Sequence, residues 1–168
     1  MRARSAREIF RVWALLHLVR ACLARAAVIG IPAALILIVL QVPIATVAFS
    51  IVEASPEVET LSQQYFFVRI WGAPATLMNF ALLGWFIGVQ NTRAALWHQL
   101  VLNGVNIVLD LAFVLGFGWG VAGVAAATAI ADTVAVLFGI WLALPVLRRL
   151  GGMFIREKIL ERAKLLRT

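Results

Sequence analysis

The sequence has 168 residues, of which 63% are hydrophobic and 14% are charged, and its formal net charge is +7. Soluble domains average about 25% charged residues, so the composition excludes a soluble domain and predicts an all-α, polytopic membrane helix bundle of about four spans, at roughly 20 apolar residues for each crossing. Almost all basic residues lie outside the apolar runs, which favours contact with membrane lipids over nucleic-acid binding.

The first 25 residues form a basic segment with six arginines and a single acid, Glu8. Its short apolar stretch, residues 12–19, resembles the hydrophobic part of a signal peptide. Arg20 and Arg25 interrupt the zone where cleavage would fall. We therefore interpret residues 1–25 as a cytoplasmic or interfacial amphipathic helix.

The first predicted span, residues 26–51, contains Pro32 and Pro43, which we expect to bend the helix. A new helix is predicted at "SPE", because Ser55 is a typical N-cap, Pro56 suits the first helical position, and the acid that follows favours a helix N-terminus. This helix leads into the second span. The remaining spans are predicted at residues 70–89, 96–117 and 121–147.

The distribution of basic residues predicts the orientation. Residues 1–25, the turn at Arg93 and the tail, residues 148–168, hold fourteen of the fifteen Lys and Arg residues, whereas the two other loops hold three glutamates and Arg69. Four spans place those three basic regions on one side, so we expect a multi-pass protein of the plasma (bacterial inner) membrane with both termini cytoplasmic. The tail is amphipathic at helical spacing, which suits a cytoplasmic helix on an anionic membrane surface.

A polar face interrupts the third span. Asn103, Asn106 and Asp110 are spaced by three and four residues, so a helix places them on one side. An aspartate near the bilayer centre costs roughly 2.5–3.5 kcal/mol on insertion scales, and such residues face the bundle interior or a wet cavity. Burial disfavours the charged carboxylate, which would let Asp110 take up and release a proton, while Asn106 could hydrogen-bond either form. The alternative is a purely structural hydrogen bond to a neighbouring helix.

Further polar residues lie in the other spans. Thr128 and Asp132 are four residues apart on one face of the fourth span. For Thr128 the alternative to a functional role is a hydrogen bond to its own helix. Asp132 could pair with a polar group on another span, either structurally or functionally. Asn79 suits a helix–helix hydrogen bond. Tyr65 is expected at the outer interface, as an ordinary residue of the aromatic belt.

Several kinds of chemistry find no support in the sequence. The single cysteine, Cys22, excludes an internal disulfide, and no metal-ligand cluster surrounds the two histidines. The G-x-G-x-x-G pattern in "GFGWGVAG" follows a membrane helix rather than a strand, so we interpret its glycines as a tight outer turn that lets helices approach closely. No nucleophile–base pair is present, which argues against an enzyme.

The motifs together resemble a known family. The short turn after "GWFIGVQ", the N-x-x-x-D of Asn106 and Asp110, and "GWGVAGVAAAT" at the start of the next span are similar to the MATE multidrug and toxin extrusion transporters, in their DinF-like branch. The resemblance covers about residues 24–144 and implies the third to sixth of twelve spans. It implies export of organic, often cationic compounds by antiport with H⁺ or Na⁺, without a further cofactor. Asn106, Asp110 and Thr128 match polar residues of the family's ion-coupling and substrate cavity, and Tyr65 matches a cavity residue less closely.

Parts of the family pattern have no counterpart in the sequence, namely the first two spans, with an acid on the first, and the second lobe. We therefore expect a partial transporter that does not transport by itself, with a small organic substrate and with the missing spans or lobe supplied by another chain. Two alternatives remain. A lipid-linked sugar flippase of the same superfamily would need basic residues facing its cavity, which the predicted span interiors lack, and a non-transporting membrane scaffold or relic would need no cavity.

Overall fold

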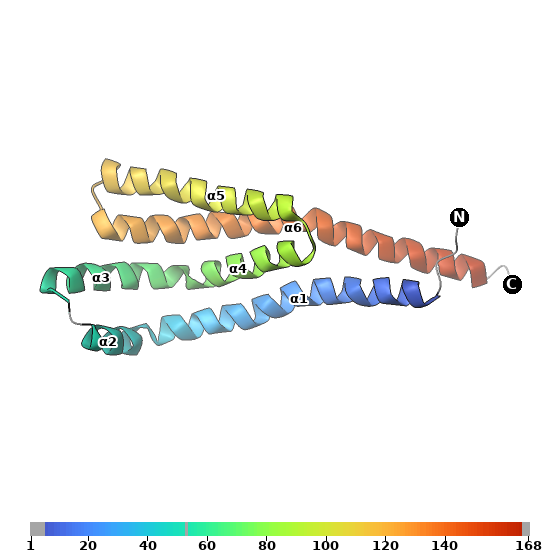
Figure 1. Ribbon diagram of the computed structural model, residues 1–168, viewed down its shortest axis with the longest axis horizontal. Coiled ribbons are helices and arrows are strands. Elements are labelled where there is room, and N and C mark those ends of the chain that lie inside the picture. Colours follow the sequence, from blue (N-terminus) through green and yellow to red (C-terminus); the bar gives the residue numbers. More distant parts are fainter. Residues whose placement is uncertain (1–5, 53, 166–168) are drawn as a thin grey trace.

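The computed structural model describes the backbone of residues 6–52 and 54–165 and the side chains of residues 21–52 and 54–148. The described part is helical and contains no strand (Figure 1). The elements in order are α1 (Ala6–Val39), α2 (Gln41–Ile51), α3 (Pro56–Arg69), the 3₁₀ turn η1 (Ile70–Gly72), α4 (Ala73–Gly88), α5 (Thr92–Asp110), the π-helical turn η2 (Leu111–Gly116) and α6 (Gly120–Leu165).

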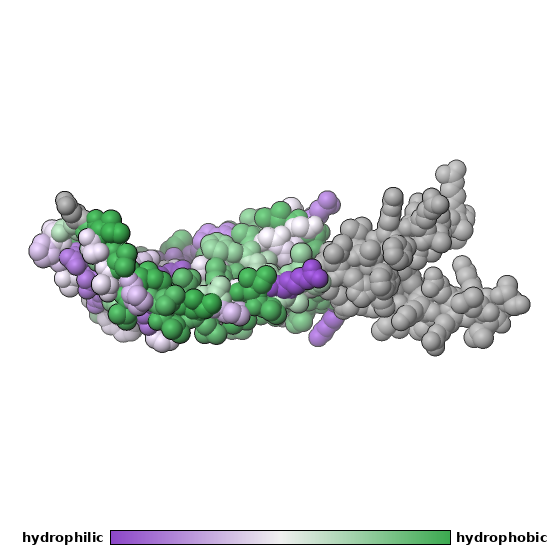
Figure 2. Space-filling view, turned by 90° about the horizontal axis from the view of Figure 1, so that it is seen from below, coloured by the Kyte–Doolittle hydropathy of each residue, from purple (hydrophilic) through white to green (hydrophobic). Residues whose placement is uncertain are grey.

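Four helical segments are long and apolar enough to cross a membrane, so the predicted helical membrane bundle is confirmed. They are Ala21–Val39, Pro56–Gly88, Thr92–Gly116 and Gly120–Arg148. The helices lie side by side as one layer, in the order α1, α3 with α4, α6 and α5 (Figure 1). Within the described residues only small parts of these spans are buried, and hydrophobic residues cover much of the face seen in Figure 2. Such a surface suits lipid or further helices.

The expected first span is divided in the structure. Helix α1 passes through Pro32 and ends at Val39, and the shorter apolar helix α2 begins at Gln41. The physical reason is Pro43, which has no N–H to donate to the carbonyl of Val39 four residues earlier. The neighbouring i→i−4 bonds, from Leu40 to Ile36 and from Ile44 to Leu40, are formed at 2.9 and 3.0 Å.

The predicted helix start at Ser55 is confirmed. The Ser55 side chain accepts a hydrogen bond from the Val58 N–H at 3.5 Å, and Pro56 occupies the first turn. From there α3, η1 and α4 run without a break to Gly88. The 3₁₀ turn forms where Pro74 lacks the N–H that would bond the Ile70 carbonyl, and the Ala73 N–H takes this acceptor instead.

Continuity through η1 corrects the sequence-based position of Arg69. We expected Arg69 on the helix that leads into the second span and counted it with the outer-loop residues, outside the span itself. It is the last residue of α3 and lies about 20 Å from Pro56 along the helix, at 1.5 Å per residue. Trp71, near the start of the predicted span 70–89, likewise lies inside the Pro56–Gly88 segment.

The turn between α5 and α6 is formed as the glycine pattern predicts, but the predicted close approach holds for one of the three glycines. A Cβ atom on Gly123 would lie 3.2 Å from Cβ of Phe113, whereas one on Gly118 or Gly120 would have no neighbour within 4 Å. Helix α5 ends at Asp110 and continues as the π turn η2, whose wider spacing is marked by the Phe117 N–H bonding the Ala112 carbonyl at 3.0 Å. Gly118 and Gly120 then adopt φ angles of 69° and 54°, which favour glycine. Asp110 is therefore the last α-helical residue before a π turn, an irregularity that is frequent at functional sites.

The basic flanks continue the spanning helices, since α1 begins at Ala6 and α6 ends at Leu165. The start of α1, the α4–α5 turn and the end of α6 all lie toward the same end of the layer (Figure 1). The side chains of residues 1–20 and 149–168, on which the predicted amphipathic faces depend, lie outside the described residues. Their position at a membrane surface stays a prediction.

Candidate functional site

Five polar side chains meet between the helices and form what we call the Asp132 cluster: Arg69 of α3, Thr76 and Asn79 of α4, His98 of α5 and Asp132 of α6. The Arg69 Nη2 atom lies 2.9 Å from Asp132 Oδ2, and the Thr76 hydroxyl donates to the same oxygen at 2.6 Å. The Asn79 amide donates to Asp132 Oδ1 at 3.0 Å. Both carboxylate oxygens are therefore occupied, and four helices are joined at one point.

The Asn79 amide also fixes the tautomer of His98. Its nitrogen donates to the backbone carbonyl and to Oδ1 of Asp132, so its oxygen faces His98 Nε2 at 3.1 Å. This oxygen can only accept, and Nε2 must therefore carry a hydrogen. The other ring nitrogen, Nδ1, is buried without a partner.

Two glycines make room for the cluster. A Cβ atom on Gly72 would lie 2.6 Å from Nη1 of Arg69 and 3.1 Å from Cβ of Ala129. A Cβ atom on Gly139 would lie 2.7 Å from Cδ2 of His98. These glycines let α6 approach α3, α4 and α5 closely enough for short polar contacts.

The Asp132 cluster carries no net charge, because the guanidinium of Arg69 offsets the carboxylate. The side chains of Arg69 and Asp132 are 24% and 6% exposed, so the carboxylate is buried and the guanidinium is partly exposed. Asp132 pairs with a polar group on another span, which the sequence allowed for in either a structural or a functional role. The Asp132 cluster therefore links the helices to one another, and it offers no carboxylate oxygen free to bind an ion.

Sequence reasoning missed Arg69, Thr76 and His98 as members of this cluster. A signal was present, because Arg69, Gly72, Thr76 and Asn79 are spaced by three, four and three residues and so share one helical face. The assignment of Arg69 to a loop hid this pattern.

A second polar group joins α5 to α6 nearer the outer turn. The Asn106 amide donates to the Thr128 hydroxyl at 3.2 Å, and this hydroxyl donates to the Val124 carbonyl at 2.9 Å. Asp110, one turn after Asn106, is partly buried, and its Oδ1 atom has no hydrogen-bond partner among the described residues. The structure thus brings Asn106 and Thr128 together and leaves an unpartnered carboxylate oxygen beside them. Thr128 bonds its own helix and a neighbouring one at the same time.

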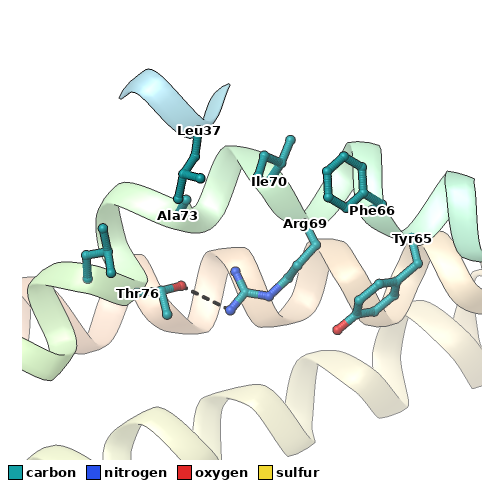
Figure 3. A pocket seen from close by; sticks show the side chains of 8 residues that line it. Leu37, Tyr65, Phe66, Arg69, Ile70, Ala73 and Thr76 are labelled. Carbon is teal, nitrogen blue, oxygen red and sulfur yellow. Dashed lines mark hydrogen bonds between the residues drawn. The ribbon is translucent and has the colours of Figure 1, made fainter. Parts of the chain in front are cut away.

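The remaining predicted residues lie elsewhere. Asn103 is exposed and accepts a bond from Gln99 on its own helix at 3.4 Å, so it does not join the Asn106 group. Tyr65 is 37% exposed and lines a cavity of about 340 Å³ between α1 and the α3–α4 segment. Figure 3 shows Tyr65 and Arg69 extending from α3 on the same side, with the guanidinium beside Thr76. The other walls of this cavity are apolar: Leu37, Phe66, Ile70, Ala73 and Leu77.

The described residues contain no group of three or more His, Cys, Asp or Glu side chains that could hold a metal ion.

The chain is similar to several known proteins. The MatE family model matches residues 15–112. The chain is 36% identical over 123 residues to the DNA damage-inducible protein F of Escherichia coli, which covers 73% of this chain and 27% of that protein. It is 31% identical over 109 residues to the multidrug export protein MepA of Staphylococcus aureus, covering 65% and 24%. It is 38% identical over 71 residues to protein DETOXIFICATION 42 of Arabidopsis thaliana, covering 42% and 14%.

The chain thus spans about a quarter or less of the length of these curated relatives. No solved structure matches it significantly. The family match extends over more than half of the sequence and includes Asn106 and Asp110, and the helices are those of a multi-pass membrane protein. By these observations the chain belongs to the MatE family of multidrug and toxin extrusion (MATE) transporters.

Proposed function

We propose that this chain supplies the ion-coupling and substrate-binding residues of a MATE-type exporter, which moves small organic, often cationic compounds in exchange for H⁺ or Na⁺. The observation that carries the proposal is the carboxylate of Asp110, whose buried Oδ1 atom has no partner. Asp132, by contrast, is held by Arg69, Thr76 and Asn79.

The contrast between the two acids assigns their roles. Among the described residues, Asp110 and Asp132 are the acids in the interior of the spans, since Glu57 and Glu59 lie in the first turn of α3. A charge already offset by an arginine attracts little further cation. The carboxylate of Asp110 is therefore the attractive group for a proton, a sodium ion or a cationic substrate.

Asn106 is arranged to assist either coupling ion. Its amide nitrogen is used by Thr128, which leaves its side-chain oxygen free, and this oxygen lies one helical turn from Asp110. The oxygen can accept a hydrogen bond from a protonated Asp110 or join the carboxylate as a sodium ligand. Thr128 thus fixes the direction of the Asn106 amide.

Competition for one carboxylate would couple the ion to the substrate. Protonation or sodium binding removes the attraction of Asp110 for a cation, so ion and substrate exclude each other. If the two occupied states prefer different packings of the helices, the ion gradient drives the exchange. The adjacent π turn, η2, is a local irregularity at which such repacking can occur.

The other parts of the proposal concern the surroundings. The transport cavity of the longer relatives needs more spans than the four found here, so we propose that further spans, on this or another chain, complete it. We propose that the protein lies in the bacterial plasma membrane with both termini cytoplasmic, that residues 1–25 and 148–168 contact anionic lipids, and that it transports rather than catalyses.

Equilibrium binding to the purified full chain tests the proposal. Radiolabelled tetraphenylphosphonium is the probe, and H⁺ and Na⁺ are titrated as competitors. We expect Asp110→Asn to reduce binding at least tenfold and to abolish the competition, whereas Glu57→Gln, a matched loss of one carboxylate outside the span interior, leaves both unchanged. Equal behaviour of the two variants would refute the role of Asp110. The matching substitution in the intact MepA protein extends the test to efflux.

The structure also bears on the flippase alternative. Arg69 is a basic side chain inside a span, which the sequence did not indicate, but its guanidinium is paired with Asp132. A single paired arginine does not form the basic cavity that a lipid-linked sugar requires, so the exporter is the better supported function. A scaffold without transport would show no binding of the cationic probe.

A further inference from the structure

A hollow of about 370 Å³ lies between the beginning of α5 and residues 142–146 of α6. Asn91, Arg93 and Trp97 line it from the α5 side, and Leu142, Pro145 and Val146 line it from α6. It is separate from the Asp132 cluster and from Asp110, and nothing in the proposed transport cycle uses it.

The hollow lies at the level of the membrane interface. Thr92 begins one spanning segment, and the apolar run of α6 is followed in the sequence by the basic pair Arg148 and Arg149, so both walls lie near the ends of apolar stretches. Leu142 lies about 9 Å deeper than Arg148, and Trp97 about 8 Å deeper than Thr92, at 1.5 Å per residue. The outer part of the hollow therefore meets lipid headgroups, and its inner part meets acyl chains.

The polar groups of the hollow are donors. Arg93 is exposed and forms no ion pair with any described residue. The described acids lie elsewhere: Glu57 and Glu59 in the first turn of α3, Asp110 at the end of α5, and Asp132 paired with Arg69. Asn91 uses its side-chain oxygen to cap the Ala94 N–H at 3.2 Å, which leaves its NH₂ group to donate outward. Trp97 is 58% exposed and adds an indole, which prefers the interface.

The charge of the surroundings favours an anion. Arg93 stands at the end of the layer to which the basic residues 1–25 and 148–168 are attached. Strongly hydrophilic residues project at this end of the described surface, beyond the apolar part (Figure 2). The apolar wall formed by Leu142, Pro145 and Val146 gives an acyl chain a place to lie, which a free anion would not need.

We propose that this hollow binds one anionic phospholipid. The phosphate accepts hydrogen bonds from the guanidinium of Arg93 and the amide of Asn91. The indole of Trp97 lies beside the glycerol region, and one acyl chain follows the wall of α6. A zwitterionic lipid carries a quaternary ammonium that the basic surroundings repel, so the hollow selects a headgroup with net negative charge.

Native mass spectrometry of the purified full chain tests this inference. The chain is released from micelles that contain dioleoylphosphatidylglycerol or dioleoylphosphatidylcholine, and retained lipid is measured against lipid concentration. We expect retention of phosphatidylglycerol, weaker retention of phosphatidylcholine, and a loss of roughly fivefold in phosphatidylglycerol affinity for Arg93→Gln, as one basic contact to the lipid is removed. Leu142→Trp, which fills the apolar part without changing the charge, should also reduce retention.

Arg25→Gln is the matched control, because Arg25 is exposed on α1 and does not line the hollow. Arg25 belongs to the basic segment proposed to contact anionic lipids, so Arg25→Gln measures general surface attraction. A clearly smaller loss in this variant than in Arg93→Gln supports a defined site, and an equal loss in the two variants would overturn it. Inorganic phosphate at millimolar concentration is expected not to displace the lipid. Displacement by phosphate, or equal retention of the two lipids, would also overturn the proposal. Helicity by circular dichroism confirms that each variant is folded.

Discussion

Neutralising Asp132 should destabilise the bundle, because Arg69 would keep its charge in a largely buried position. The Asp132 side chain is 6% exposed, and its carboxylate accepts bonds from Arg69, Thr76 and Asn79. Removing one partner of a buried pair costs about 3–5 kcal/mol. The side chain of Arg69 is 24% exposed and can draw on some water, so for Asp132→Asn we expect the lower end, about 3 kcal/mol.

The double variant Arg69→Met with Asp132→Asn removes both charges. We expect it to be more stable than either single variant, with a coupling free energy of about 2 kcal/mol, because a neutral replacement of a buried ion pair is often tolerated. The measurement is unfolding of the full chain in mixed micelles titrated with sodium dodecyl sulfate and followed by circular dichroism. Additive effects of the two single variants would refute the inference that Arg69 and Asp132 act as one pair.

Asp110→Asn provides the internal comparison in the same assay. Its Oδ1 atom has no partner to lose, so neutralising this side chain removes an uncompensated partly buried charge. We expect no loss of stability, and a gain of up to about 1 kcal/mol, because burial of an unpaired charge is unfavourable. A loss as large as that of Asp132→Asn would contradict the distinction between the two acids.

Two further substitutions test the local structure around these sites in the same unfolding assay. Gly72→Ala should lower the free energy of unfolding by about 1–3 kcal/mol through overpacking, because the new Cβ atom would lie 2.6 Å from Nη1 of Arg69. Gly88→Ala is its control, because nothing lies within 4 Å of the new atom. This variant should be neutral or stabilising. Ser55→Ala should cost about 0.5–1 kcal/mol by removing the cap of α3, and a neutral result would show that the 3.5 Å bond to the Val58 N–H contributes nothing.

The helices were predictable because their signals are local. Apolar length predicts a span, and Ser55 followed by Pro56 predicts a helix start, so both are readable from a short window of sequence. The division of the first span at Leu40 depends on which carbonyl Pro43 leaves without a donor. Pro43 predicts a bend near Leu40 from the sequence, but whether the helix kinks or ends at that point depends on the packing of the fold.

The site was predictable only in part, because its partners are distant in sequence. Helical periodicity alone places Asn106 and Asp110 on one face of a helix. The hydrogen bond from Asn106 to Thr128 joins two spans, and these two residues are 22 positions apart in the sequence. The bond from Arg69 to Asp132 joins residues 63 apart. An arginine at the edge of an apolar run reads as a loop residue, and only the continuous helix from Pro56 to Gly88 places it at the depth of its partner.

Helix α6 connects the two polar groups and so relates stability to function. Thr128 and Asp132 are one turn apart on α6; the first bonds Asn106 on α5, and the second bonds residues of α3 and α4. In the Asp132 cluster the charge of Arg69 offsets that of Asp132, and both carboxylate oxygens have hydrogen-bond partners. These contacts fix α6 against α3 and α4. The group at Asp110 retains an unpartnered oxygen next to a π turn, so the contact of α5 with α6 is the one whose free energy depends on what occupies the carboxylate. A change in the charge of Asp110 is therefore expected to move α5 and η2 against an α6 that stays attached to α4, rather than to loosen the layer as a whole.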